Sequence, residues 1–328
     1  MKLQQLRCIF QIVQSEFNIS KASEVLNTSQ PGVSKQIKLL EDEIGIKIFQ
    51  RNGKRLVNLT EPGELILSSI ETILQESNNI KVISEEYTEK DQGTFTIATT
   101  HTQARYKLPK VVEEFVKKYP KTNLNIHQGN PSQVTDQIIN GEADVGIATE
   151  SINLSEDILT IPCYQWNRCV VMPKNHPLTE LRKITLEDLA AYPMITYDYA
   201  FTGSTIVSEV FKNANIEPNI MLTAIDADVI KTYVSLNMGI GLIAEMAFDV
   251  STDHPMVSRD VSHLFPLSTT YIGIRRENFL RKYTSDFIRM FIPKASEKEL
   301  KKILNKKYLY TKQVRFYKVL LKNIIYNQ

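Results

Sequence analysis

The sequence predicts an α/β protein that begins with a small, mostly helical module. Three observations predict it. Residues 1–60 contain two short amphipathic helices joined by a tight turn, residues 60–91 carry a seven-residue apolar repeat, and residues 94–276 alternate strand-like with helix-like segments. The 328 residues leave room for about two or three domains, each with its own core.

Composition excludes several classes of protein. Hydrophobic residues make up 42% of the chain and charged residues 23%, as in ordinary globular proteins. No apolar run approaches the roughly 18 to 20 residues of a membrane span, and MKLQQLRCIF lacks the pattern of a signal peptide. The three cysteines form no CxxC pair. We therefore expect a cytoplasmic protein with no membrane contact and no disulfide framework.

Charge is distributed unevenly along the chain. Residues 1–60 contain nine Lys and Arg against five Asp and Glu, residues 61–293 twenty against thirty, and residues 294–328 ten against two. Basic ends therefore flank an acidic middle, which favours a polyanionic partner for one end.

The early part of the chain predicts two helices joined by a tight turn. Asn18 or Ser20 can cap the first, and Ser29 can cap the second, which ends near Gly45. Three apolar side chains of the second helix repeat at helical spacing and predict a buried stripe: Val33, Ile37 and Leu40. This arrangement is typical of a helix-turn-helix DNA-binding motif.

The opposite side of the second helix carries side chains suited to the major groove. They are Gln30, Pro31, Ser34, Lys35 and Lys38. Gln can bond adenine bidentately, Ser can bond either partner, and Lys can reach guanine edges or phosphates. A hairpin that turns at Asn52-Gly53 would then present three basic residues to phosphates: Arg51, Lys54 and Arg55. The alternative is a solvated basic helix and hairpin in another fold, but the ordered set of features favours DNA binding.

A long helix capped by Thr60 is predicted next, and the helix-breaking segment DQG at 91–93 ends it. Its heptad positions are mostly apolar: Ile66, Ile70, Ile73, Ser77, Ile80, Ser84 and Tyr87. Such a seam suits pairing with a second copy of the helix. Packing on its own chain is the alternative.

The acidic middle predicts alternating strands and helices. The expected strands are 94–100, 123–129, 144–149, 158–164, 168–173, 194–197, 220–225, 240–245 and 269–276. The expected helices are 103–119, 131–140, 204–215 and 227–237. In open α/β sheets, ligands bind beyond the carboxyl ends of the strands, beside the N-termini of helices.

Uncharged side chains follow three of these strands. Thr100, Thr102 and Gln103 follow the first, Thr149 ends the third, and Thr202 precedes the helix after strand 194–197. We expect such a site to hold a small anion or a short polar acid by hydrogen bonds. Any one of these threonines can equally be a helix cap.

No catalytic motif stands out. The sequence contains no GxSxG, HExxH or Walker motif, and its histidines show no metal spacing. We therefore predict that the protein is not an enzyme, binds no metal and needs no cofactor beyond a small anionic effector. Taken alone, the single tryptophan, Trp166, is expected in the core.

The run SQPGVSKQIKLLEDEIGIKIFQR, with LTEPG after it, resembles the winged helix-turn-helix domain of LysR-type transcriptional regulators. The segments TTHTQARYKLP, NPSQVTDQIINGEADVGIATE, PCYQWNR, FTG and DADVIKTYVSLNMGIGLIAE resemble the CysB branch of that family, and the resemblance covers residues 1–293.

The resemblance implies three parts: a DNA-binding domain (1–59), a dimerising linker helix (60–91) and an effector-binding domain (92–328). It also implies that this last domain is built like type II periplasmic binding proteins, with subdomain I at about 92–162 and 269–293 and subdomain II at about 163–268. By the same resemblance, a sulfate-sized anion would be held by Thr100, Thr102, Gln103, Thr149 and Thr202, with Trp166 lining the site.

The function implied is control of sulfate assimilation and cysteine biosynthesis genes in response to acetylserine or a sulfur metabolite. The implied partners are an operator in double-stranded DNA, further copies of the chain in a dimer or tetramer, and RNA polymerase. One alternative is that the chain is a sibling regulator of sulfonate use that senses adenylylsulfate. Another is that it is a solute-binding or enzymatic α/β domain.

The basic tail, residues 294–328, has no counterpart in the resemblance. Val314, Tyr317, Leu321 and Ile324 would share one face of a helix. Packing on the effector-binding domain or on a partner copy fits this pattern, and so does a helix that contacts DNA or a membrane surface.

Overall fold

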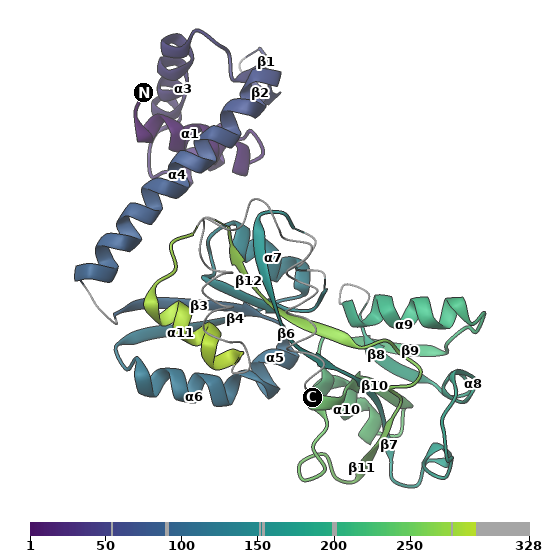
Figure 1. Cartoon of the computed structure of the whole chain (residues 1–328). Coiled ribbons are helices and arrows are strands. Elements are labelled where there is room, and N and C mark those ends of the chain that lie inside the picture. The colour runs from purple at the N-terminus through teal and green to yellow at the C-terminus, as the bar shows by residue number, and fades with distance from the viewer. Residues whose placement is uncertain are drawn as a thin grey trace, which may run out of the picture. The chain divides into compact units, whose positions relative to one another are not determined.

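The computed structural model describes residues 1–53, 55–88, 92–150, 152, 155–198, 202–276 and 278–292, with the side chains of 202–205 left out. The chain divides into two compact units, Met1–Thr88 and Glu89–Gln328 (Figure 1). Lys54 and the basic tail, on which two of the predictions fall, lie outside the described residues. In the part of the chain that is described, no helix is long and apolar enough to cross a membrane.

The first unit contains the predicted pair of helices and hairpin. Its elements are α1 (Leu3–Gln14), α2 (Ile19–Val25), α3 (Gln30–Ile44), β1 (Phe49–Asn52), β2 (Arg55–Leu59) and α4 (Glu61–Thr88). The Asn18 side chain caps α2, and the Ser29 hydroxyl accepts a hydrogen bond from the Gly32 N–H at the start of α3. Gly45 ends α3 in the left-handed conformation, at φ 72°. Val33, Ile37 and Leu40 are buried as predicted.

A buried carboxylate fixes the connection from α3 to the hairpin. Glu41 is only 2% exposed, and its Oε1 accepts hydrogen bonds from the N–H groups of Ile48 (3.0 Å) and Phe49 (3.4 Å). Lys47 Nζ lies 3.1 Å from its other oxygen. Since these contacts hold the first residue of β1, they set the orientation of the hairpin relative to α3.

The long helix α4 begins as predicted, because the Thr60 hydroxyl accepts a hydrogen bond from the Gly63 N–H at 3.0 Å. Along its heptad seam, Ile70 is buried within the first unit, whereas Ile73, Ile80 and Tyr87 are exposed. The seam therefore packs on its own chain only near its start.

The second unit contains two five-stranded sheets, each forming the centre of a subdomain. The first sheet has the order β4-β3-β5-β12-β6 and comprises β3 (Gly93–Thr99), β4 (Thr122–Gln128), β5 (Val145–Ala148), β6 (Ile158–Trp166) and β12 (Ser268–Arg275). Its helices are α5 (His101–Tyr106), α6 (Leu108–Lys118), α7 (Pro131–Ile139) and α11 (Lys282–Phe291). Helices α6 and α11 pack on one face of this sheet and α7 on the other (Figure 1).

The second sheet has the order β11-β7-β10-β8-β9. It comprises β7 (Arg168–Pro173), β8 (Met194–Tyr197), β9 (Ile220–Ala224), β10 (Ile240–Ala244) and β11 (Met256–Asp260). Helices α8 (Leu186–Ala190) and α9 (Thr202–Asn213) pack on one face, and α10 (Ala227–Ser235) packs on the other. The 3₁₀ turns Pro177–Thr179 and Glu245–Ala247 lie in this subdomain.

The structure differs from the sequence predictions at several points. We expected the chain to cross between subdomains near residues 163 and 268; β6 stays in the first sheet through Trp166, so the first crossing is at Asn167, and the return lies between β11 and β12. The single helix expected over 103–119 is two helices that meet at Lys107, because Pro109 lacks an N–H and starts a new first turn. The sequence analysis did not predict α1, α8, α11 or the edge strand β11, which pairs with β7.

Candidate functional site

The exposed side of α3 presents the side chains predicted to read DNA. Gln30, Pro31, Lys35 and Lys38 are exposed, and Ser34 is half-buried. They lie opposite the buried stripe, so none is needed for the core. In the hairpin, Arg51 and Arg55 are exposed as well, but Arg51 Nη2 also lies 4.0 Å from the buried Glu41 Oε2. Phosphate contact by these residues stays a prediction.

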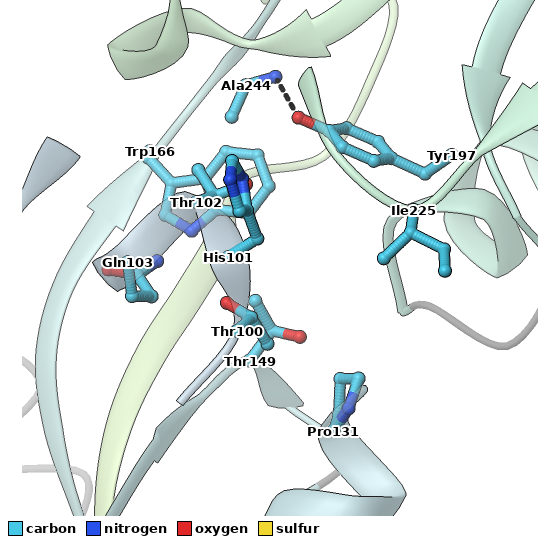
Figure 2. A pocket seen from close by; sticks show the side chains of 10 residues that line it. All are labelled: Thr100, His101, Thr102, Gln103, Pro131, Thr149, Trp166, Tyr197, Ile225 and Ala244. Atoms are coloured by element: carbon cyan, nitrogen blue, oxygen red, sulfur yellow. Dashed lines mark hydrogen bonds between the residues drawn. The ribbon is translucent and has the colours of Figure 1, made fainter. Parts of the chain in front are cut away.

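One pocket of the second unit gathers most of the residues predicted to bind an effector. It contains about 470 Å³ of empty space, a figure that includes the solvent in its open mouth. Its lining, shown in Figure 2, is Thr100, His101, Thr102, Gln103, Pro131, Thr149, Trp166, Tyr197, Ile225 and Ala244. Both subdomains contribute to this lining, because the pocket lies between the two sheets.

The two hydroxyls of Thr100 and Thr149 follow neighbouring parallel strands. β3 and β5 pair so that Thr99 is opposite Ile147, and each strand ends at the pocket. Thr100 is the residue just before α5, and Thr149 is 8% exposed. Thr202, the sixth predicted residue, begins α9; its side chain lies outside the described part of the chain.

Gln103 is held more firmly than the sequence suggested. It is 1% exposed, its Nε2 donates to Thr270 Oγ1 at 3.2 Å, and its Oε1 accepts a hydrogen bond from the Tyr164 hydroxyl. Burial raises the pKa of Tyr164 above its usual value, which keeps the hydroxyl a neutral donor. Gln103 therefore anchors α5 to β12 and β6, and the sequence contained no signal for Tyr164 or Thr270 as its partners.

Trp166 lines the pocket at the crossing between subdomains. The Arg168 guanidinium carbon lies 5.1 Å from the centre of its ring, and Arg168 donates to Ser268 Oγ (2.9 Å) and to the carbonyl of Pro266 (3.2 Å). Arg168 thus ties the first crossing to the second. The Trp166 Nε1 is buried and has no hydrogen-bond partner in the described part of the chain.

The lining contains little charge. Tyr197 accepts a hydrogen bond from the Ala244 N–H at 3.3 Å (Figure 2), and burial raises the pKa of its hydroxyl to about 12. The lining includes no Asp, Glu, Lys or Arg among the residues that the structure describes. A pocket of hydroxyls and apolar walls suits a small polar anion bound by hydrogen bonds rather than by ion pairs.

One group near the pocket has the composition of a metal site. Ligand atoms of His101, Asp226 and Asp228 lie within 4.8 Å of one another. However, Asp228 already accepts hydrogen bonds or ion pairs from Arg105 Nε (2.8 Å), the Tyr106 hydroxyl (2.7 Å) and Lys231 Nζ (3.2 Å). Since a metal ion would compete with two cations for this carboxylate, the arrangement is better described as a salt-bridge network.

Comparisons with known proteins cover both units. The family model "Bacterial regulatory helix-turn-helix protein, lysR family" matches residues 3–64, and "LysR substrate binding domain" matches residues 88–295. The chain is 48% identical over 304 residues to the HTH-type transcriptional regulator SsuR of Burkholderia cenocepacia, covering 93% of this chain and 99% of that protein. It is 45% identical over 302 residues to CysB of Haemophilus influenzae, covering 92% and 93% respectively.

A solved structure agrees with the second unit. The cofactor-binding domain of the Cbl transcriptional regulator superposes with a TM-score of 0.63 at 35% sequence identity, covering 68% of this chain and 96% of that one.

Proposed function

Because this chain belongs to the LysR family of bacterial transcriptional regulators, we propose that it controls genes for sulfate assimilation and cysteine biosynthesis in response to a small acetylserine or sulfur-metabolite effector. It is a DNA-binding regulator of the same kind as SsuR, CysB and Cbl. The first unit contains its helix-turn-helix domain, and the second is its effector-binding domain. As a regulator, it would act in the cytoplasm, on operators in double-stranded DNA and together with RNA polymerase.

The observation that carries the effector proposal is the single neutral pocket in which Thr100, Thr102 and Thr149 meet Trp166 at the crossing between the subdomains. A ligand there contacts both subdomains, so it binds one arrangement of them better than another. Such a difference in affinity is what allows a ligand to shift a conformational equilibrium. The altered arrangement would change how two DNA-binding domains are spaced on the operator.

Titration calorimetry of the full chain with sulfate, O- and N-acetylserine and adenylylsulfate tests the pocket. We expect one of these compounds to bind. Thr149→Val should weaken its binding about tenfold, because one hydrogen bond to a charged group is lost while the side chain keeps its shape. Thr223→Val, an exposed position on β9, is the matched control. Adenylylsulfate as the sole binder would favour the rival regulator of sulfonate use, and no heat from any compound would refute the pocket.

Replacement of Lys35 tests the DNA-binding face. Lys35→Ala should weaken binding to the operator about tenfold and relax base preference, because a groove contact contributes roughly 1–3 kcal/mol. Footprinting upstream of cysteine-biosynthesis genes, repeated at several salt concentrations, measures both effects. Lys110→Ala removes the same charge from an exposed position of the second unit and should change nothing. Unchanged base preference in Lys35→Ala would reject its role at the bases.

We also propose that the chain acts as a dimer or tetramer through α4. Besides the seam, the first unit contains an apolar groove formed by Leu6, Leu40, Ile44, Ile46, Leu65, Ile66, Ile70 and Ile73. Leu65 is 73% exposed and Ile80 68%. A second copy of α4 is the occupant that matches the heptad spacing, and a dimer would present two α3 helices roughly 34 Å apart, or at multiples of that distance.

A further inference from the structure

The helix that forms one wall of the pocket is docked at its far end onto the other subdomain. Helix α5 follows β3 of the first subdomain, and its first turn supplies His101, Thr102 and Gln103 to the pocket. Tyr106, at its last turn, packs with the apolar core between α10 and the second sheet, a core that includes Val171, Ile195 and Ile230. The Tyr106 side chain thus reaches from a helix of the first subdomain to the core of the second.

The second subdomain supplies both hydrogen-bond partners of the Tyr106 hydroxyl, Lys231 and Asp228. Lys231 of α10 is 7% exposed, and its Nζ contacts Asp253 Oδ1 (2.8 Å) and the carbonyl of Ala247 (2.9 Å). The same Nζ donates to the Tyr106 hydroxyl at 3.1 Å, and that hydroxyl donates to Asp228 Oδ1 at 2.7 Å. Tyr106 therefore both accepts from a buried cation and donates to a carboxylate, so its two hydrogen bonds are charge-assisted.

The neighbouring contacts are weaker or more exposed. Arg105 reaches the Asp228 carboxylate at 2.8 Å, but its side chain is 60% exposed, so solvent screens this ion pair. His101 Nε2 lies 4.0 Å from Asp228 Oδ2 and is too distant for a hydrogen bond. Of these contacts, only the part-buried Tyr106 hydroxyl bonds both a cation and a carboxylate of the second subdomain, Lys231 and Asp228.

We propose that Tyr106 is a positioning residue that latches the two subdomains together behind the pocket, so that effector affinity depends on a side chain that lines no part of the binding site. This rests on the proposed function only where it concerns the effector. The latch holds pocket-forming residues of α5 near those of β8 and β10, which favours the arrangement of the subdomains seen in this structure before any ligand binds. If a variant populates that arrangement less, its apparent affinity falls by the same fraction.

Tyr106→Phe is the sharpest test, because it removes only the hydroxyl and leaves the ring in its apolar site. The chain contains one tryptophan, Trp166, which lines the pocket, so quenching of its fluorescence by acrylamide reports opening of the pocket without any ligand. In the full chain, we expect Tyr106→Phe to increase quenching and to weaken binding of sulfate, measured by calorimetry, about tenfold.

A matched control lies within a single subdomain. Tyr119 of the first subdomain donates to Asp286, which also pairs with Lys118 at 2.6 Å, so a tyrosine, a lysine and an aspartate meet there as they do at Tyr106. Tyr119→Phe should lower the melting temperature without changing quenching or sulfate affinity. Arg105→Gln, which removes the exposed ion pair, should produce a smaller change in the same direction as Tyr106→Phe.

The outcomes separate the two proposals. Equal quenching in the wild type, Tyr106→Phe and Tyr119→Phe would overturn the latch, whatever binds in the pocket. Increased quenching in both Tyr106→Phe and Tyr119→Phe would show that Tyr106 contributes to stability only, and this result would also overturn the latch. Failure of sulfate to bind the wild type, with quenching increased in Tyr106→Phe alone, would count against sulfate as the effector and leave the latch supported.

Discussion

Glu41→Ala should destabilise the first unit by about 3 kcal/mol and abolish operator binding at physiological temperature. Glu41 is buried, and it accepts hydrogen bonds from the N–H groups of Ile48 and Phe49. Each buried donor left without a partner costs roughly 1–3 kcal/mol, and the truncated side chain leaves a cavity as well. Since these bonds also orient the hairpin, DNA binding should fail before global unfolding.

Hydrogen exchange followed by mass spectrometry would measure this effect within the first unit of the full chain. The matched control is Asp42→Ala. Asp42 is exposed and lies 3.8 Å from the same Lys47, so its loss should cost less than about 1 kcal/mol. Similar exchange rates in the two variants would contradict a structural role for the buried carboxylate.

Ile80→Asp should produce the second large effect, dissociation of the proposed dimer. The position is 68% exposed in the single chain and lies on the heptad seam of α4. A dimer would bury two new carboxylates side by side, each of which costs several kcal/mol to desolvate. We expect the dissociation constant to rise at least about 100-fold, since each 1.4 kcal/mol is a factor of ten.

Sedimentation velocity over a range of concentrations measures the dissociation constant, and operator binding should weaken in parallel because two half-sites are no longer read together. Asn78→Asp adds the same charge to an exposed position outside the seam and should leave the assembly intact. An unchanged oligomeric state in Ile80→Asp would place the interface between copies elsewhere on the chain.

The local features of the fold were predictable from the sequence. Asn18 and Ser29 cap their helices, Gly45 ends α3, and the apolar stripe of α3 is buried. Helix caps, left-handed glycines and apolar spacing act over a few residues, so the amino acids that produce them are neighbours in the chain. The placement of the strand-end threonines Thr100 and Thr149 near each other was predictable as well, because parallel strands of one sheet end at a common edge.

Contacts between distant residues were not predictable. Glu41 stands in the charged run Glu41-Asp42-Glu43, where nothing distinguishes the buried carboxylate from the exposed ones. The break at Lys107 was visible in the sequence but was missed: Pro109 falls in the interior of the helix expected over 103–119, where its lack of an N–H ends one helix and starts another.

By itself, the sequence determined the order of the parts: a basic helix-turn-helix, a long helix with an apolar seam, and an α/β domain with hydroxyl side chains at its strand ends. Only the tertiary structure decided that Gln103 is anchored by Tyr164 and Thr270, and that Tyr106 docks onto Asp228 and Lys231, 122 and 125 residues further along. The physical reason is that these partners come from segments far apart in the chain: Tyr164 and Thr270 lie on β6 and β12 of the first sheet, and Asp228 and Lys231 lie on α10 of the other subdomain. Periodicity within one such segment contains no information about another.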